Sequence, residues 1–296
     1  MPPRARASIS ASLPRDISQF LSHYPSNPVR PQASANLDFY QGRIAAKPSK
    51  KKVEELQNEL RGNWDELEYN HSFVQWLFPI REQGVNYQAQ PLELHEIAQL
   101  RQDPIAMSRL IESYRIMLAF YGLRLVDEQT GELTLEDSTP APSPSSYLRR
   151  FQNLERNTHN FLRITRILKC LNEFRFPQHP PSLLLYILAL QASSNHYLSS
   201  PGLIRSMDGY WRHCVRDDRD REFIAQKVEE VRSGEGEWDE NEYREWIKRR
   251  AAERVKENDG EDSVEKDNER EGKEDASEAD KDGKESGENG KRCPIL

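Results

Sequence analysis

The segment from Trp64 to Pro79, WDELEYNHSFVQWLFP, constrains the fold of this chain more than any other. Asp65 and Glu66 stand where the start of a helix favours negative charge, and Pro79 disfavours helical conformation in the residue before it. At about 100° per residue, the apolar side chains cover an arc of roughly 240°. They are Trp64, Leu67, Tyr69, Phe73, Val74, Trp76, Leu77 and Phe78. A helix that is apolar over most of its circumference needs neighbours on several sides, so we expect it at the centre of a helical domain.

Three polar residues, Glu66, Asn70 and His71, fall inside this apolar arc. One interpretation is that they are buried and hydrogen-bonded to neighbouring helices, as buried polar groups are in most proteins. The other is that they form a small polar site in the middle of the domain. The sequence pattern leaves both interpretations open.

The two ends of the chain differ in composition from its middle. Residues 1–36 hold six prolines and four arginines without periodicity, which predicts a disordered arm in which residues 17–24 could dock as a helical turn. From Ala252 to Arg292 there are 16 acidic and 9 basic residues, so this segment alone accounts for the net charge of −7 of the whole chain. We therefore expect residues 251–296 to form a disordered acidic tail.

Between these ends, residues 37–250 predict a single multi-helix globular domain of the all-α class. Asp103 and Pro104 form an N-cap followed by a first-turn proline, and Gly122 ends the helix that they open. The segment 123–135 is the one β signal and predicts a small hairpin around Thr130 and Gly131. A Pro/Ser linker, residues 139–146, interrupts the domain. Further helices are expected over residues 53–60, 91–101, 147–157, 159–175, 182–198, 201–215, 217–232 and 239–255.

Two segments are rich in basic residues. Four lysines lie within Lys47–Lys52, and seven basic but only two acidic residues lie between Arg149 and Arg175. In the helix expected over residues 159–175, Arg163, Arg166 and Lys169 lie opposite the apolar face. Such a face could neutralise nucleic-acid phosphates, or it could be a solvated surface that pairs with acidic neighbours. No recognition-helix motif accompanies it, so we expect no sequence-specific nucleic-acid binding.

The sequence carries no catalytic or metal-binding signature. There is no phosphate-binding loop or nucleophile elbow, and the histidines have no metal-ligand spacing, so we expect neither an enzyme nor a cofactor. Cys170, Cys214 and Cys293 are too few and too widely spaced for a disulfide framework or a zinc site. There is no secretory signal, and the longest apolar run, Leu183–Leu190, is too short to span a bilayer. We expect a nuclear, perinuclear and cytoplasmic protein that is not secreted.

Four blocks of the sequence, in order, resemble the conserved domain of the opioid growth factor receptor family. They are LDFYQGR (37–43), NWDELEYNHSFVQWLFPIRE (63–82), MLAFYGLRL (117–125) and the segment from RFQNL to NFLRITRILKCL (150–171). The resemblance implies a receptor without enzymatic activity that binds the pentapeptide Met-enkephalin, restrains proliferation, and is associated with the nucleus and its surrounding membranes. The C-terminal repeats of vertebrate members are absent from this sequence.

A peptide of this kind requires a carboxylate for its ammonium group beside an aromatic wall for its tyrosine ring, because a buried cation without a partner is costly. Glu66, with Asn70 and Phe73 beside it on the expected helix and His71 next in sequence, is the predicted ligand-binding set. The competing hypothesis is a nuclear, nucleic-acid- or chromatin-associated interaction module that uses the two basic segments.

The last four residues, Cys293-Pro294-Ile295-Leu296, fit a C-terminal prenylation box, and the terminal leucine indicates geranylgeranyl. Pro294 departs from the usual aliphatic residue, and only Lys291 and Arg292 precede the box in an acidic segment. A single lipid without a basic patch gives reversible membrane binding. The sequence therefore predicts Cys293 as a lipidation site that would add a peripheral membrane location, with a chance cysteine as the alternative.

Overall fold

The computed structural model of the protein describes residues 13–136 and 145–257. A first compact unit ends at Ile247 and a second begins at Lys248. The helices of the first half are α1 (Arg15–Leu21), α2 (Ala35–Tyr40), α3 (Val53–Leu60), α4 (Trp64–Tyr69), α5 (Val74–Leu77), α6 (Leu94–Arg101) and α7 (Pro104–Phe120). After the strands β1 (Leu123–Leu125) and β2 (Leu133–Leu135) come α8 (Ser145–Arg156), α9 (His159–Glu173), α10 (His179–Ala192), α11 (Pro201–Gly209), the 3-10 helix η1 (Trp211–His213) and α12 (Asp218–Ser233). Residues 240–257 are also helical. The predicted all-α class is confirmed.

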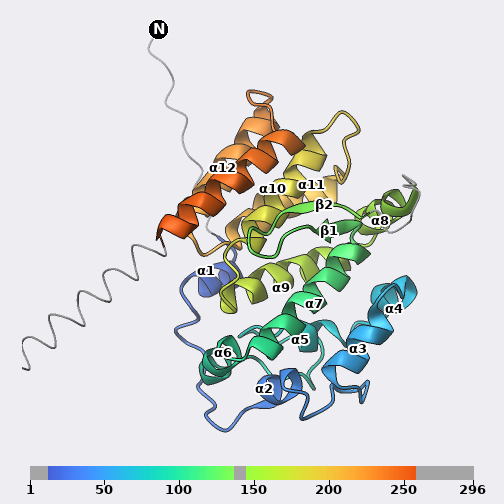
Figure 1. Ribbon diagram of the computed structural model, residues 1–296, viewed down its shortest axis with the longest axis vertical. Helices are drawn as coiled ribbons and strands as arrows, with labels where there is room; N and C mark the ends of the chain where they lie inside the picture. Colours follow the sequence, from blue (N-terminus) through green and yellow to red (C-terminus); the bar gives the residue numbers. More distant parts are fainter. Residues whose placement is uncertain (1–12, 137–144, 258–296) are drawn as a thin grey trace, which may run out of the picture. The chain divides into compact units, whose positions relative to one another are not determined.

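Two long helices, α7 and α9, run through the middle of the first unit, with α2 to α6 on one side and α10 to α12 on the other (Figure 1). Asp103 caps α7 as predicted, because its carboxylate accepts hydrogen bonds from the backbone N–H groups of Ile105 and Ala106 at 3.0 and 3.1 Å. Nearly every residue of α10 is buried, which is why its sequence is apolar all round. Within the described ranges, no helix combines the length and apolar character that a bilayer crossing requires.

The hairpin predicted over residues 123–135 is confirmed as the antiparallel pair β1–β2, in which Leu123 lies opposite Leu135. Its turn contains Gly131 at φ 77°, a left-handed conformation that glycine adopts without steric cost. The hairpin is fixed to α10 and to the last helical segment through Tyr243, whose hydroxyl oxygen accepts the backbone N–H of Leu133 at 2.8 Å and lies 2.7 Å from the hydroxyl of Ser182.

The single helix expected over Trp64–Pro79 is wrong: the segment forms two short helices, α4 and α5, that Asn70 separates. Asn70 has extended backbone angles, φ −84° and ψ 120°. Its side-chain oxygen accepts hydrogen bonds from the backbone N–H and the hydroxyl of Ser72, at 2.8 and 2.7 Å. This local turn competes with the helical hydrogen bonds, as asparagine side chains often do. Tyr69, placed in the apolar arc by the helical pattern, is consequently 78% exposed.

Residues 17–24 dock as the helical turn that the sequence allowed, within α1 and the residues after it, although residues 13–36 as a whole do not form the disordered arm expected from their composition. From residue 13 onward the chain lies against the helical domain, and α1 buries Ile17 and Phe20 completely. Tyr24, just beyond α1, is also buried. These three side chains supply the apolar area that the polar composition of the arm as a whole concealed.

Candidate functional site

An open groove of about 830 Å³ lies beside the turn that separates α4 from α5. Its walls come from that turn, from the end of α3, from the loop before α3 and from the loop after α5. The lining residues are Pro48, Ser49, Lys51, Glu59, Glu66, Tyr69, Asn70, His71, Ser72, Val85, Asn86, Tyr87 and Gln88. Tyr69 and Tyr87 are large aromatic residues that are 78% and 85% exposed, so two rings border the groove without being part of the core.

Hydrogen bonds from two asparagine side chains give the groove its form. The amide of Asn70 donates to Oε1 of Glu66 at 2.6 Å, which orients that carboxylate. The amide of Asn86 donates to the backbone carbonyls of Lys47 and Ser72, at 2.9 Å each, and so ties together three of the segments that line the groove. The other carboxylate of the groove, that of Glu59, is paired with Lys51.

Glu66, Asn70 and His71, three of the four residues predicted for ligand binding, line this groove together. The fourth, Phe73, does not: it is 2% exposed, and its ring lies in the core with the guanidinium of Arg163 5.4 Å from its centre. The aromatic walls are Tyr69 and Tyr87 instead. The helical periodicity missed them because it placed Tyr69 in the core, and because Tyr87 lies in a loop without periodicity.

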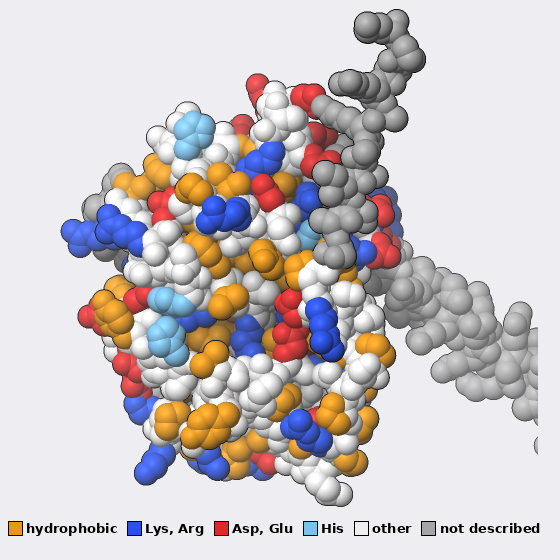
Figure 2. Space-filling model, turned by 180° about the vertical axis from the view of Figure 1, so that it is seen from behind, with side chains coloured by type: hydrophobic (Ala, Val, Ile, Leu, Met, Phe, Trp, Pro, Cys, Tyr) orange, Lys and Arg blue, Asp and Glu red, His pale blue; other side chains and the backbone are white. Residues whose placement is uncertain are grey.

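A second, smaller hollow of about 320 Å³ adjoins the groove, since His71 and Val85 line both. One wall is α9, which contributes Arg163, Arg166 and Lys169; Gln75 of α5 and Gly84 of the following loop line it too. On the face that Figure 2 shows, basic, acidic and hydrophobic side chains lie close together in the hollowed middle of the surface.

The basic side chains of α9 do not form the solvated or phosphate-binding face that the sequence suggested. Arg163 is 5% exposed and donates to the backbone carbonyls of Leu67 and Asn70, at 2.5 and 3.0 Å. Nε of Arg166 donates to the carbonyl of Phe78 at 2.7 Å. The two arginines therefore cap the C-terminal ends of α4 and α5, where unpaired carbonyls and the helix dipole favour a cation. Burial lowers the pKa of Arg166 to about 10, which leaves it charged at neutral pH.

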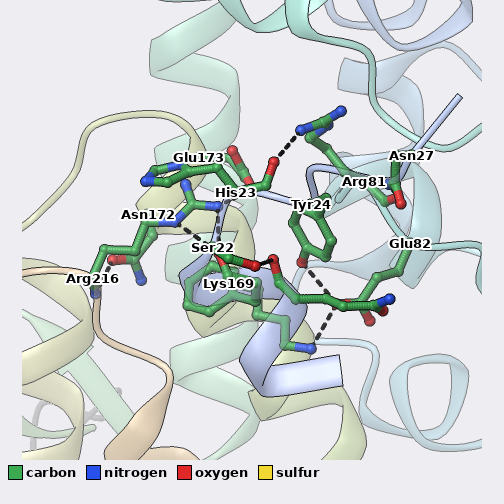
Figure 3. Close-up of polar contacts among 12 residues, drawn as sticks. Ser22, His23, Tyr24, Asn27, Arg81, Glu82, Lys169, Asn172, Glu173 and Arg216 are labelled. Atoms are coloured by element: carbon green, nitrogen blue, oxygen red, sulfur yellow. Dashed lines mark hydrogen bonds and ion pairs between the residues drawn. The ribbon is translucent and has the colours of Figure 1, made fainter. Parts of the chain in front are cut away.

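Lys169 is buried between α9 and the N-terminal segment. Its ammonium group lies 2.9 Å from Oδ2 of Asp16. It also lies 2.7 Å from Oε1 of Glu82, and the hydroxyl of Tyr24 donates to the same oxygen of Glu82 at 2.7 Å (Figure 3). Burial by itself would lower the pKa of Lys169, but the hydrogen bonds and charges of Glu82 and Asp16 outweigh it and raise that pKa. The pKa of Tyr24 is raised by burial and by the charge of Glu82.

Arg216 and Arg81 hold the rest of this segment. Arg216 donates to the carbonyl of Phe20 at 3.2 Å, lies 4.4 Å from the centre of the Phe20 ring, and pairs with Glu173 at 2.6 Å. Arg81 donates to the carbonyl of His23 at 2.6 Å (Figure 3). The N-terminal segment is thus held by charged side chains that contact its backbone carbonyls and its aromatic rings.

The two cysteines in the described part of the chain, Cys170 and Cys214, are fully buried and form no disulfide. Burial raises the pKa of Cys214 to about 12 and that of Cys170 well above its ordinary value, so neither is a thiolate at neutral pH. In the described ranges, no three His, Cys, Asp or Glu side chains gather so that they could hold a metal ion. Cys293, the predicted lipidation site, lies outside the described residues.

These features define a class of protein: a helical module with an open groove, bordered by tyrosines and holding one oriented carboxylate. The family model for the opioid growth factor receptor conserved region matches residues 29–238. The chain belongs to the opioid growth factor receptor family.

Named relatives agree with this assignment. The chain is 35% identical to mouse (Mus musculus) opioid growth factor receptor-like protein 1 over 209 residues, which is 70% of this chain and 42% of the relative. It is 36% identical to the human (Homo sapiens) opioid growth factor receptor over 204 residues, 68% of this chain and 28% of that protein. The match thus spans less than half the length of these relatives. No solved structure matches.

Proposed function

We propose that this protein is a non-enzymatic, receptor-like module that binds a short peptide of the enkephalin type in the groove beside α4 and regulates cell growth through that binding. One relative is named an opioid growth factor receptor and another an opioid growth factor receptor-like protein, and the groove offers what such a peptide needs. The observation that carries the proposal is the carboxylate of Glu66, oriented by Asn70, in a groove bordered by the exposed rings of Tyr69 and Tyr87.

The proposed contacts follow from the chemistry of these groups. A peptide ammonium would pair with Glu66, and a peptide aromatic ring would lie against Tyr69 or Tyr87, since aromatic pairs gain energy beyond the area that they bury. His71 and Asn70 would offer further hydrogen bonds from the same wall. The groove is open, so a ligand could enter without a conformational change.

The competing function is a nuclear, nucleic-acid- or chromatin-associated module. Of its two basic segments, the one on α9 has Arg163, Arg166 and Lys169 engaged with the protein itself, while Lys47, Lys50 and Lys52 remain exposed in the loop before α3. Three exposed lysines would give weak binding that falls steeply with salt and has no preferred sequence. A single sequence recovered from random oligonucleotides at physiological salt would favour this function.

We further propose a nuclear, perinuclear and cytoplasmic location, with a peripheral membrane fraction anchored by a lipid on Cys293. Intact-mass analysis of the protein from its own cells tests whether Cys293 carries a lipid. Loss of the last three residues with gain of a geranylgeranyl group and a methyl ester supports it, and an unmodified Leu296 terminus rejects it.

Isothermal titration of the full chain with Met-enkephalin tests the function, with a scrambled peptide and the N-acetylated peptide as ligand controls. We expect saturable binding of Met-enkephalin alone. Glu66→Gln should weaken it on the order of tenfold or more, because the ammonium loses a charge-assisted hydrogen bond.

The matched protein control is Glu229→Gln, a carboxylate that is 76% exposed and outside the groove. It should leave the affinity unchanged. Binding that Glu66→Gln does not alter would remove Glu66 from the site, and no binding of the peptide would reject the function.

A further inference from the structure

We infer that the smaller hollow binds the C-terminal carboxylate of the peptide whose ammonium end lies beside Glu66, so that the protein selects short peptides with a free C-terminus. The inference rests on the proposed function and adds to it the second recognition element and the direction in which the peptide lies. The residue that we assign to the carboxylate is Arg166.

The first observation is the charge of the hollow. Its walls include three cationic side chains and two acidic ones, Asp16 and Glu82. Both acidic groups are engaged by Lys169, at 2.9 and 2.7 Å. Within the described ranges, neither Arg163 nor Arg166 has a carboxylate at ion-pair distance. Arg166 is left with only the more distant charge of Glu82, which Lys169 already contacts, so three cations face two carboxylates and the hollow is suited to an anion.

The second observation is that Arg166 has unused donors. The terminal nitrogens of Arg163 donate hydrogen bonds to the carbonyls of α4 and of its C-cap residue. In Arg166, only Nε donates, to the carbonyl of Phe78. Its two terminal nitrogens have no acceptor in the part of the chain that the structure describes. A guanidinium held by one nitrogen and open at the others is suited to a carboxylate.

The third observation is a polar side chain beside Arg166 that also lacks a partner. Gln75 is 7% exposed, and its side-chain oxygen has no hydrogen-bond partner among the described residues. The backbone of Gly84 lies against both residues: a Cβ there would be 2.4 Å from Cγ of Gln75 and 3.1 Å from Nη1 of Arg166. The carboxamide of Gln75, turned about its last bond, would offer an N–H to the same anion.

The fourth observation is that the hollow and the groove are adjacent, because His71 and Val85 line both. On the inference, one peptide extends past these two residues from the groove into the hollow. An extended peptide of five residues spans about 17 Å at most. Val85 and Leu162, which are 88% and 74% exposed, border the hollow and would contact an apolar side chain on the last residue of the peptide. The ligand class is therefore a short peptide with an apolar C-terminal residue and both ends free.

The test compares Met-enkephalin with its C-terminal amide in titrations of the full chain. We expect the amide to bind on the order of tenfold to a hundredfold more weakly, because it lacks the charged acceptor. Arg166→Gln should weaken binding of the free acid by a similar factor and leave binding of the amide unchanged. Arg115→Gln is the matched control, since Arg115 is a half-exposed arginine outside both cavities, and it should change neither affinity.

The outcomes separate the inference from the function on which it rests. Equal affinities of the free acid and the amide would overturn the inference and leave peptide binding in place, whereas no binding of either peptide would overturn both. Should Arg166→Gln fail to fold, as circular dichroism would show, the comparison of the two peptides on the unaltered chain decides alone. Inorganic phosphate should compete with the free acid and not with the amide; saturable phosphate binding beside equal peptide affinities would assign the hollow to phosphate and reject the carboxylate.

Discussion

The ammonium nitrogen of Lys169 lies 2.7 Å from Oε1 of Glu82 in a place where the lysine side chain is only 1% exposed. The same nitrogen contacts Asp16, so one buried cation joins α9, the loop after α5 and α1. None of these elements would bury this charge alone. The pair therefore fixes how the N-terminal segment attaches to the rest of the first unit.

Removal of the Glu82 charge should destabilise the fold. Glu82→Gln leaves the buried ammonium of Lys169 with the half-exposed Asp16 as its one acidic partner, and a buried cation that loses a partner costs about 2–3 kcal/mol. Urea unfolding at pH 7 measures this. Glu229→Gln, which breaks an exposed pair 3.6 Å apart, should stay within about 0.5 kcal/mol of the unaltered protein. Equal midpoints for the two variants would contradict the role given to Glu82.

The N-terminal segment should contribute to stability through Phe20. This side chain is completely buried beneath the guanidinium of Arg216, and Phe20→Ala should lower the free energy of unfolding by about 3–5 kcal/mol. Val29→Ala, in the same segment but 70% exposed, should change it by less than about 0.5 kcal/mol. Thermal unfolding of the two variants side by side provides the measurement, and an unchanged midpoint for Phe20→Ala would mean that α1 does not dock in solution.

Gly84 should tolerate no larger side chain. The Cβ of Gly84→Ala would lie 2.4 Å from Cγ of the buried Gln75, so that side chain must move, at a cost of about 1–3 kcal/mol. The same shift should weaken binding of a free-acid peptide more than that of its amide. Gly209→Ala is the control: nothing lies within 4 Å of its Cβ, and alanine at the end of α11 should be neutral or stabilising by up to about 1 kcal/mol. Equal stabilities of the two variants would disprove the close contact.

Acidification should weaken the fold in part through His159. Burial, then the charge of Arg163 and the neighbouring His71, lower its pKa below the ordinary 6.5, although the charge of Glu68 opposes them. A lowered folded-state pKa means that stability is complete above about pH 6.5 and is lost as the pH falls through the folded-state value. His159→Gln should therefore flatten the fall in unfolding midpoint below pH 6.5.

The flattening should be partial, because the pKa values of His23 and His213 are also lowered, chiefly by burial. His196→Asn, at an exposed histidine with positive φ that asparagine adopts readily, is the control and should leave the pH profile unchanged. A His159→Gln profile that is parallel to that of the unaltered protein would contradict the prediction.

The elements that the sequence predicts correctly are those that depend on a few neighbouring residues. The cap at Asp103, the glycine turn of the hairpin and the apolar α10 each follow from a few adjacent residues, and all three are present. The division between α4 and α5 could not be read in the same way, because Asn70 is compatible with either a helix or a turn. It is stable as a turn because Arg163, 93 residues away, donates a hydrogen bond to its backbone carbonyl. Every residue has a backbone carbonyl, so the sequence does not indicate which one accepts such a long-range hydrogen bond.

The candidate site was predictable to a similar extent. Glu66, Asn70 and His71 stand out in the sequence because they interrupt an apolar pattern, and in the structure they lie together. In the sequence, Arg166 is only one member of a basic face. The helical spacing correctly places Arg163, Arg166 and Lys169 on one face of α9. Whether such a face is solvated or buried depends on the hydrogen-bond acceptors of the neighbouring elements, and the tertiary fold sets their positions.

The contact between Phe20 and Arg216 sets the order of events during synthesis of this chain. The two residues are separated by 196 positions, and at 5–20 residues per second a ribosome needs about 10–40 s to make the intervening chain. Until Arg216 is made, Phe20 lacks this contact, although the other contacts of the segment, with Arg81, Glu82 and Lys169, are already available. The attachment of this segment is thus completed only after both residues, 196 positions apart, have been made.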